Sequence, residues 1–243
     1  PDSFRETLAA AAKVAEDGLI ATIGVRPNRP ETGYGYLKIG ARLPGAKGKG
    51  RSQAHRVERF VEKPDLVTAA RYLAEGGYLW NSGIFVFRSD VILEEIHRAM
   101  PVLGEQLAVI ERALGTRAYQ KTLARAFPGA PSISIDYGVM EKSQRIACVP
   151  ADFGWSDVGS FAALSEVRPA DDLGNVTVGE AMVIDGRGNV VLAQARRPVA
   201  LIGLDQVVVV DSGDAVLVVR KEKAQDVRKA VEELRRRGRD GLL

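Results

Sequence analysis

The stretch GIFVFRSDVILEEIHRAM, residues 83–100, decides the fold class. Residues 83–88 are apolar enough for a buried strand, and Ser89 or Asp90 is a typical N-cap for a helix that runs to about Met100. Apolar residues recur on one face of that helix, namely Val91, Ile92, Ile96 and Met100. A strand that leads directly into an amphipathic helix is typical of an α/β sheet.

The same alternation continues on both sides of this stretch. The patterns predict helices over 3–16, 64–75, 102–114, 117–126 and 160–167. They predict strands over 19–25, 36–40, 56–61, 132–135 and 145–150, the last two around a short helix. Residues 43–53 are rich in Gly and Lys and are predicted to form a surface loop. We therefore predict one α/β domain over residues 1–168.

The pattern changes after Pro169. Six short β-runs follow, separated by turn residues, over 176–178, 181–184, 189–193, 199–202, 206–210 and 215–219. We predict a small all-β domain over 169–220, a solenoid or a curled sheet. A charged amphipathic helix, 222–237, is expected within the C-terminal segment 221–243.

Composition excludes several classes of protein. The 243 residues hold 34 basic and 31 acidic side chains, and this net charge of +3 gives no reason to expect nucleic-acid binding. We expect no membrane span and no signal peptide, because no apolar run approaches ~18 residues. The single Cys148 excludes an internal disulfide, fits a cytoplasmic location, and is expected to be a buried hydrophobe. His55 and His97 have no partners at ligand spacing and are expected to be structural.

Polar and glycine residues gather in four segments that we expect in loops: 31–36, 60–64, 80–83 and 152–159. Each also has an ordinary structural explanation. Gly33 to Tyr36 could be a turn with aromatic packing, and Glu62 with Lys63 a surface ion pair. Residues 81–83 and 154–160 (GWSDVGS) could be plain turns, the latter with Asp157 bonded to its own backbone.

Taken together, these side chains suit one chemistry. Lys63 supplies a point charge for a phosphate. Glu62 can accept hydrogen bonds from two sugar hydroxyls, and Asn81 can both donate and accept. Gly35 lets the backbone approach a ligand closely. Asp157 is a hard oxygen ligand suited to Mg²⁺. This inventory fits a sugar phosphate held beside a metal ion.

Five motifs carry a family resemblance. They are ETGYGY (31–36), FVEKP (60–64), WNSGIF (80–85), SIDYGVME (134–141) and GWSDVGS (154–160). In this order they resemble the mannose-1-phosphate guanylyltransferase (GDP-mannose pyrophosphorylase) family of sugar nucleotidyltransferases. The Glu-Lys-Pro run is shared by most sugar nucleotidyltransferases, whereas the last two motifs are much more specific to the mannose branch.

The resemblance implies a Rossmann-like nucleotidyltransferase domain with a mixed, mainly parallel sheet. A small β-helix-like domain, often used for dimerisation, would follow it, so a homodimer through that domain is expected. The implied reaction transfers GMP from GTP to mannose-1-phosphate in the presence of Mg²⁺, which gives GDP-mannose and pyrophosphate.

The resemblance also implies roles for particular residues. Tyr34 and Gly35 would line the sugar pocket, and Asn81 with Ser82 would bind the sugar. Glu62 would bind mannose hydroxyls. The two implied catalytic residues are Lys63, which would bind the sugar phosphate, and Asp157, which would ligate Mg²⁺.

The sequence departs from the family in one respect. The family's N-terminal Gly-rich nucleotide-binding segment has no counterpart here, so we expect this chain to carry only the sugar-phosphate half of the site. The alternatives are a fragment of a full enzyme, a subunit of a split enzyme, and a non-catalytic sugar-phosphate binder. A nucleotidyltransferase for another hexose-1-phosphate is a further alternative. Without the missing strands we expect exposed strand edges and an isolated chain that aggregates or oligomerises.

Overall fold

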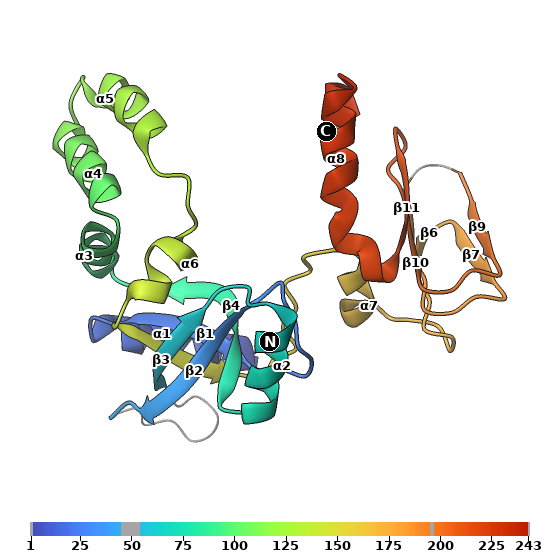
Figure 1. Cartoon of the computed structure of the whole chain (residues 1–243), viewed down its shortest axis with the longest axis horizontal. Coiled ribbons are helices and arrows are strands. Elements are labelled where there is room, and N and C mark those ends of the chain that lie inside the picture. Colours follow the sequence, from blue (N-terminus) through green and yellow to red (C-terminus); the bar gives the residue numbers. More distant parts are fainter. Residues whose placement is uncertain (1, 45–53, 195–196, 243) are drawn as a thin grey trace. The chain divides into compact units, whose positions relative to one another are not determined.

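The computed structural model describes residues 2–44, 54–194 and 197–242, so most of the predicted 43–53 loop lies outside the described residues. The chain divides into two compact units, residues 1–155 and 156–243, and each unit is described by itself (Figure 1). The sequence patterns predict a domain boundary between residues 168 and 169, whereas the division between the two compact units lies between residues 155 and 156.

The first unit is built on a ring of five strands. These are β1 (Ile20–Val25), β2 (Gly35–Arg42), β3 (His55–Val61), β4 (Tyr78–Val86) and β5 (Ile146–Ala151), in the order β1-β4-β2-β3-β5. Only the β1–β5 pairing of this sheet is parallel, and the other four are antiparallel. The α/β class is confirmed, but a mainly parallel sheet is wrong for the described residues. Two parallel neighbours need a long crossover connection. Most of the unit lies between β1 and β5 in the chain, so these two strands have such a connection.

The sheet of the first unit closes into a ring, whereas we expected open strand edges, and the closing contact is limited to two residue pairs. The ring closes where β3 meets β5, through the residue pairs His55–Cys148 and Arg56–Ala147. Each of the five strands therefore has a neighbour on both sides. A closed sheet removes the edges that would otherwise pair with another chain.

The first unit also contains helices. They are α1 (Asp2–Glu16), α2 (Leu66–Glu75), α3 (Ser89–Ala99), α4 (Pro101–Ala113), α5 (Tyr119–Ala126) and α6 (Ile135–Gly138), with 3₁₀ turns at Phe127–Gly129 and Met140–Lys142. Of these, α3, α4 and α5 project away from the ring (Figure 1). The helices predicted in this unit are confirmed. The strand predicted over 132–135 is wrong, because Ser134 is the N-cap of α6 and Asp136 lies in its first turn. A carboxylate in the first turn favours the helix through its dipole.

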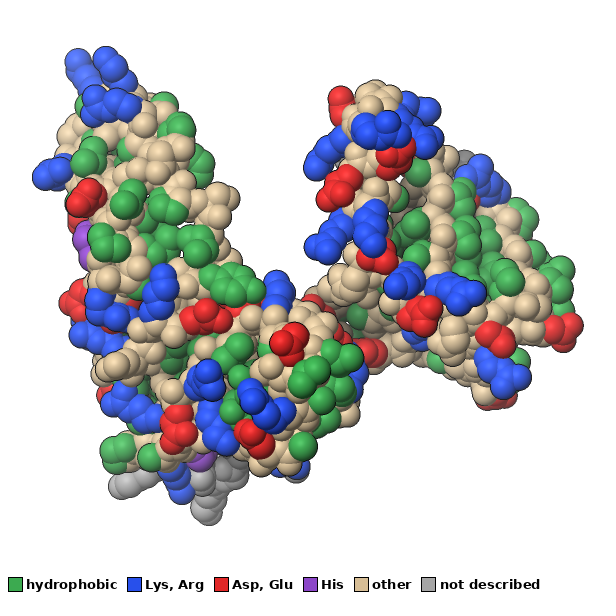
Figure 2. Space-filling model, viewed as in Figure 1, with side chains coloured by type: hydrophobic (Ala, Val, Ile, Leu, Met, Phe, Trp, Pro, Cys, Tyr) green, Lys and Arg blue, Asp and Glu red, His purple; other side chains and the backbone are tan. Residues whose placement is uncertain are grey.

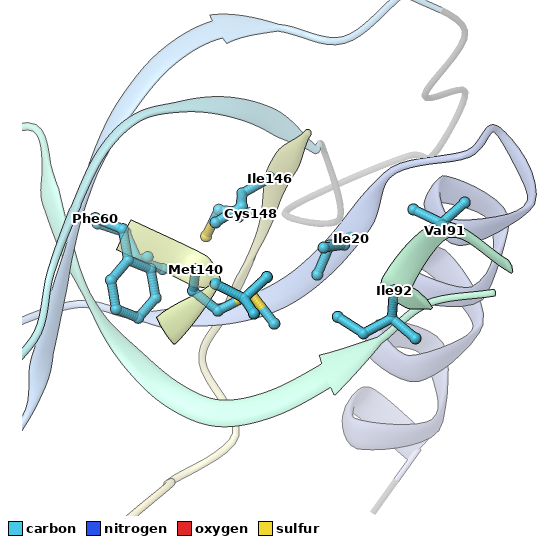
Figure 3. Packing of buried hydrophobic residues seen from close by; sticks show 9 residues of the cluster. Ile20, Phe60, Val91, Ile92, Met140, Ile146 and Cys148 are labelled. Atoms are coloured by element: carbon cyan, nitrogen blue, oxygen red, sulfur yellow. The ribbon is translucent and has the colours of Figure 1, made fainter. Parts of the chain in front are cut away.

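Apolar side chains from strands and helices fill one side of the ring (Figure 3). Ile20 of β1, Phe60 of β3 and Cys148 of β5 pack there against Ile92 of α3 and against Met140. Burial raises the pKa of the Cys148 thiol, so it stays protonated and behaves as a small hydrophobe, as predicted. The same core joins the strand ends to the Met140–Lys142 turn.

The second unit consists of short strands, and all six predicted β-runs are confirmed. They are β6 (Val176–Gly179), β7 (Ala181–Ile184), β8 (Val190–Ala193), β9 (Val199–Ile202), β10 (Val207–Asp211) and β11 (Val216–Arg220). One sheet has the order β11-β10-β8-β6, and β7 pairs with β9 in a second sheet. Alternate strands stack in parallel, as in a β-helix: β6 pairs with β8, β8 with β10, and β7 with β9. The exception is β11, which returns antiparallel to β10.

Short helices flank these sheets. The helix predicted over 160–167 is a 3₁₀ turn (Phe161–Ala163) that continues into α7 (Leu164–Val167). The C-terminal helix begins as a 3₁₀ segment (Lys221–Asp226) and continues as α8 (Val227–Arg236), with a last 3₁₀ turn at Asp240–Leu242. No helix in the described parts of the chain is long and apolar enough to cross a membrane.

The second unit leaves apolar side chains exposed on its strands (Figure 2). Met182 and Ile184 of β7 are exposed, and Ile184 pairs with the exposed Ile202 of β9. Val216 and Val218 of β11 are exposed as well. We call these five residues the apolar strand residues of the second unit. They lie in two different sheets, Met182, Ile184 and Ile202 in one and Val216 and Val218 in the other. Exposed apolar side chains that gather on a sheet are typical of an interaction site.

Candidate functional site

The site in the first unit begins where β2 passes the end of β3. A Cβ atom added at Gly35 would lie 2.5 Å from Glu62 Oε2, 3.2 Å from Asn81 Cβ and 3.5 Å from Phe60 Cζ. Only a glycine fits that space without displacing the Glu62 carboxylate. The structure thus brings Gly35, Glu62 and Asn81 together, as the sequence patterns predicted.

Lys63 occupies a strained turn directly after Glu62. Its φ of 47° lies in the left-handed region, which a residue with a Cβ seldom adopts. The Lys63 N–H donates to the Tyr34 carbonyl at 3.2 Å, which ties the turn to the start of β2. The Lys63 ammonium lies 3.4 Å from Glu62 Oε1, and just over half of its side-chain surface stays exposed. A cation held this way can still reach a phosphate.

Asn81 lies inside a strand, so the prediction that residues 80–83 form a loop is wrong. It belongs to β4, where the register of the pairing with β1 shifts between Thr22 and Gly24. Because of this irregularity, residues 80–83 lack the regular alternation by which a strand is predicted from sequence. The buried Asn81 Oδ1 accepts hydrogen bonds from Thr22 Oγ1 at 2.7 Å and from the Gly83 N–H at 3.3 Å. Its amide nitrogen is then the donor that it offers to a ligand. Ser82 Oγ accepts a hydrogen bond from the Ile84 N–H at 3.3 Å.

Aromatic rings pack beside these polar groups. The buried Tyr34 makes edge-to-face contacts with Trp80 and with Trp155, each with ring centroids 5.2 Å apart. The Arg29 guanidinium lies 5.3 Å from the centroid of the Trp80 ring, and Arg29 also bonds Glu31. Such interlocked rings hold Tyr34, and with it the carbonyl that receives the Lys63 N–H, in one place.

Sequence reasoning left aside one group of site residues, those of the segment 134–141. Glu141 Oε1 accepts a hydrogen bond from the Glu62 N–H at 2.8 Å, and the Tyr137 hydroxyl donates to the Glu62 carbonyl at 3.5 Å. The family motif SIDYGVME indicated that this segment could belong to the site. No local pattern predicts the contact between Glu141 and Glu62, because the two residues lie far apart in the sequence.

Glu62 sits in an unfavourable electrostatic setting. Its side chain is only 9 % exposed, and burial is the main reason that its pKa is raised. The carboxylates of Asp136 and, more weakly, Glu141 raise this pKa further, while Lys63 lowers it. Perturbed groups of this kind cluster at functional sites. A ligand that offers hydroxyl donors would relieve part of the cost of the buried charge.

Asp157 belongs to the second unit and is held by local contacts. Its Oδ1 accepts a hydrogen bond from the Gly159 N–H at 3.1 Å, and the neighbouring Val158 has a φ of 48°. Asp157 therefore closes a tight turn of its own backbone. Across residues 2–44, 54–194 and 197–242 no three or more His, Cys, Asp or Glu side chains form a group that could hold a metal ion.

The two predicted structural histidines bond to backbone carbonyls. His55 Nδ1 lies 3.2 Å from the Gly40 oxygen, and His97 Nδ1 lies 2.8 Å from the Leu93 oxygen. Both contacts fit structural roles and give neither ring a place in the site.

Comparisons with known proteins agree with the two-part organisation. The nucleotidyl transferase family profile matches residues 1–172, and the MannoseP isomerase/GMP-like beta-helix domain profile matches residues 179–234. A solved structure from Thermus thermophilus, described as a mannose-1-phosphate geranyltransferase, is 39 % identical with a TM-score of 0.80. That match covers 96 % of this chain and 65 % of the other.

Curated relatives match almost the whole chain. The xanthan biosynthesis protein XanB of Xanthomonas campestris (strain B100) is 41 % identical over 98 % of this chain and 49 % of its own length. The mannose-1-phosphate guanylyltransferase of Klebsiella pneumoniae is 40 % identical over 97 % of this chain and 49 % of its own length. The chain spans about half the length of these relatives. Since a single family profile covers well over half of its residues, the chain belongs to the nucleotidyl transferase family, with a GMP-like β-helix domain after it.

Proposed function

We propose that this chain provides the sugar-phosphate half of a mannose-1-phosphate guanylyltransferase. In the proposed reaction a phosphate oxygen of mannose-1-phosphate attacks the α-phosphorus of GTP. A new P–O bond forms, the bond between the α- and β-phosphates breaks, and pyrophosphate leaves with that electron pair. The products are GDP-mannose and pyrophosphate. One P–O bond forms for each one that breaks, so the reaction needs no oxidant or reductant.

One observation carries this proposal: Gly35, Glu62, Lys63 and Asn81 converge on one place. The Glu62 carboxylate would accept sugar hydroxyls, the Asn81 amide would donate to the sugar, and the Lys63 ammonium would bind the phosphate. These groups bind and orient the nucleophile, and orientation is the main protein contribution to phosphoryl transfer.

Mg²⁺ is part of the proposal, with Asp157 as one ligand. Mg²⁺ is usually held by one or two carboxylates together with substrate phosphates and water. The exposed Asp157 carboxylate meets that limited requirement, although its Oδ1 also accepts the Gly159 N–H. When bound, the ion would offset the negative charge of the phosphates.

The experiment is to follow pyrophosphate release from GTP, mannose-1-phosphate and Mg²⁺ with the purified chain mixed with the separately expressed N-terminal nucleotide-binding segment of a relative, because this chain is proposed to carry only the sugar-phosphate half of the site. Asp157→Asn is the informative variant, because the amide oxygen still accepts the Gly159 N–H while the charge is lost. We expect a fall in rate of about 100-fold with an unchanged melting temperature. Release that is equal in the variant and in the wild-type chain would contradict the metal role of Asp157.

A second candidate function, a sugar-phosphate binder or a subunit of a split enzyme, is favoured by the sugar-side character of the described site. Calorimetry with mannose-1-phosphate and with GTP, each alone, separates the candidates. Binding of the sugar phosphate without GTP binding and without turnover would support this second function. Tighter binding of another hexose-1-phosphate would instead change the proposed substrate.

The proposal includes a cytoplasmic homodimer formed through the second unit. The apolar strand residues Met182, Ile184, Ile202, Val216 and Val218 are what support it. Light scattering of the wild-type chain and of Ile202→Asp tests this, with a dimer expected for the former and a monomer for the latter.

A further inference from the structure

The turn that carries Glu62 and Lys63 is held at successive backbone groups by three residues from two other segments. Glu141 receives the Glu62 N–H, Tyr137 donates to the Glu62 carbonyl, and Tyr34 receives the Lys63 N–H. The turn needs such support, because a lysine at positive φ is strained and its surroundings must offset the cost. The Glu141 bond is the shortest of the three, at 2.8 Å.

The segment that carries Glu141 is itself anchored. The Arg98 guanidinium donates to the Lys142 carbonyl at 2.8 Å, directly after Glu141 in the chain. Arg98 is in turn held by two hydrogen bonds from its guanidinium to the buried Glu95 carboxylate, at 3.2 and 2.8 Å. Met140, on the other side of Glu141, is fully buried in the core of the unit. An exposed glutamate thus stands on a rigid base.

We infer that Glu141 is a positioning residue: its carboxylate fixes the Glu62–Lys63 turn so that the Glu62 carboxylate and the Lys63 ammonium face one hexose phosphate. The inference rests on the proposed function for the identity of the ligand. It adds a residue that does not touch the ligand but determines where two ligand-binding groups stand.

Glu141 acts on the turn in two separable ways, by accepting a hydrogen bond and by carrying a charge. Glu141→Ala removes both, whereas Glu141→Gln keeps an acceptor oxygen and removes the charge. The other charged groups that act on Glu62 are Asp136 and Lys63, and both remain in either variant. Glu105→Ala, on α4, is the matched control for loss of an exposed glutamate.

The first measurement is amide hydrogen exchange of the ligand-free chain, which needs no assumption about the substrate. In Glu141→Ala we expect the Glu62 amide to exchange at least ~5-fold faster than in the wild-type chain, with Glu141→Gln and Glu105→Ala close to wild type. Equal exchange in Glu141→Ala and wild type would overturn the inference whatever the chain binds.

The second measurement is calorimetric affinity for mannose-1-phosphate as a function of pH. We expect about 10-fold weaker binding in Glu141→Ala and near wild-type affinity in Glu141→Gln at neutral pH. Because the Glu141 charge raises the pKa of Glu62, the loss of binding on acidification should move to lower pH in Glu141→Gln. An effect on thermal stability alone would not move this profile.

The outcomes separate the two ideas. If the wild-type chain binds no hexose phosphate, the proposed function fails, and the exchange measurement still decides whether Glu141 holds the turn. If the wild-type chain binds and Glu141→Ala binds equally well, the positioning role fails while the proposed function stands.

Discussion

Two nearly buried carboxylates, one in each unit, have opposite surroundings. Asp211 of the second unit accepts hydrogen bonds from Arg197 Nε at 2.6 Å and Arg197 Nη2 at 2.8 Å. It also accepts one from the Gly213 N–H at 2.9 Å. Arg197 lowers the pKa of Asp211 below its usual range. Glu62 of the first unit is buried beside Asp136 and has a raised pKa, which the exposed Lys63 only partly offsets.

The difference separates polar groups that hold the fold from the group that we propose binds a ligand. In the second unit buried polar groups satisfy one another, as Asn175 and Asn189 do across successive turns of the β-helix. In the first unit the Glu62 carboxylate is desolvated and faces like charge. A folded protein keeps such a costly arrangement where binding or catalysis requires it.

The largest expected effect comes from filling the space at Gly35. The added Cβ of Gly35→Ala would meet the flexible end of the Glu62 side chain, so the carboxylate moves while the fold stays. We expect about 100-fold weaker binding of mannose-1-phosphate and little change in melting temperature. Calorimetry and thermal unfolding measure the two.

Gly33→Ala is the matched control for this variant. A Cβ at Gly33 would meet only the end of the Glu31 side chain, at 3.3 Å from its Oε1, and would not meet Glu62. Binding should stay within ~3-fold of wild type. Equal losses in both variants would show that the loop as a whole, and not the Glu62 position, sets affinity.

The second unit should respond in stability and not in binding. Asn189→Ala leaves the Leu204 carbonyl and the Val207 N–H without the partners that Asn189 supplies at 2.7 and 2.9 Å. We expect the free energy of unfolding of this unit to fall by ~2–3 kcal/mol, as measured by urea denaturation. Gln225→Ala, an exposed amide, is the control. A large loss of mannose-1-phosphate binding in Asn189→Ala would break the contrast between the units.

Acid should reveal the structural carboxylate. The pKa of Asp211 is lowered in the folded protein, so its contribution to stability is present above the unfolded value of about 3.9 and disappears as pH falls through the folded pKa. The stability difference between wild type and Asp211→Asn should therefore be full at neutral pH and shrink in acid. Urea denaturation at several pH values checks this, and a difference that grows in acid would contradict it.

The sequence predicted most elements because their signals are local. Alternation and turn residues were sufficient for all six β-runs of the second unit, and caps with apolar spacing for the long helices of the first. The same local rules misassigned residues 80–83, because β4 is irregular in its pairing with β1 between Asn81 and Phe85, and pairing between strands has no local signal. They also misread 132–135, where Ser134 and Asp136 begin a helix.

Most residues of the candidate site could be predicted from the sequence, but the contacts between them could not. Glu62, Lys63 and Asn81 emerged from residue chemistry and from the family motifs. The role of Glu141 depends on a contact between segments far apart in sequence, which only the fold supplies. Asp157 shows the reverse: its turn with Gly159 was among the sequence-based alternatives, while its metal role is a proposal that the described contacts neither require nor oppose.

The smallest predicted effect is a gain in stability from replacing Glu62, whereas the other variants lose stability or binding. Because the pKa of Glu62 is raised, its ionised form costs stability, and that cost grows as pH rises from the usual value of 4.5 through the raised pKa. Glu62→Gln should therefore increase the free energy of unfolding at neutral pH by ~1 kcal/mol or less, and by nothing in acid, while mannose-1-phosphate binding falls sharply. Urea denaturation at neutral and acidic pH measures the gain, with Glu105→Gln as the control. If the variant is instead less stable at neutral pH and equally stable in acid, then the ion pair with Lys63 outweighs the cost of burial. Glu62 would then be a structural carboxylate of the same kind as Asp211.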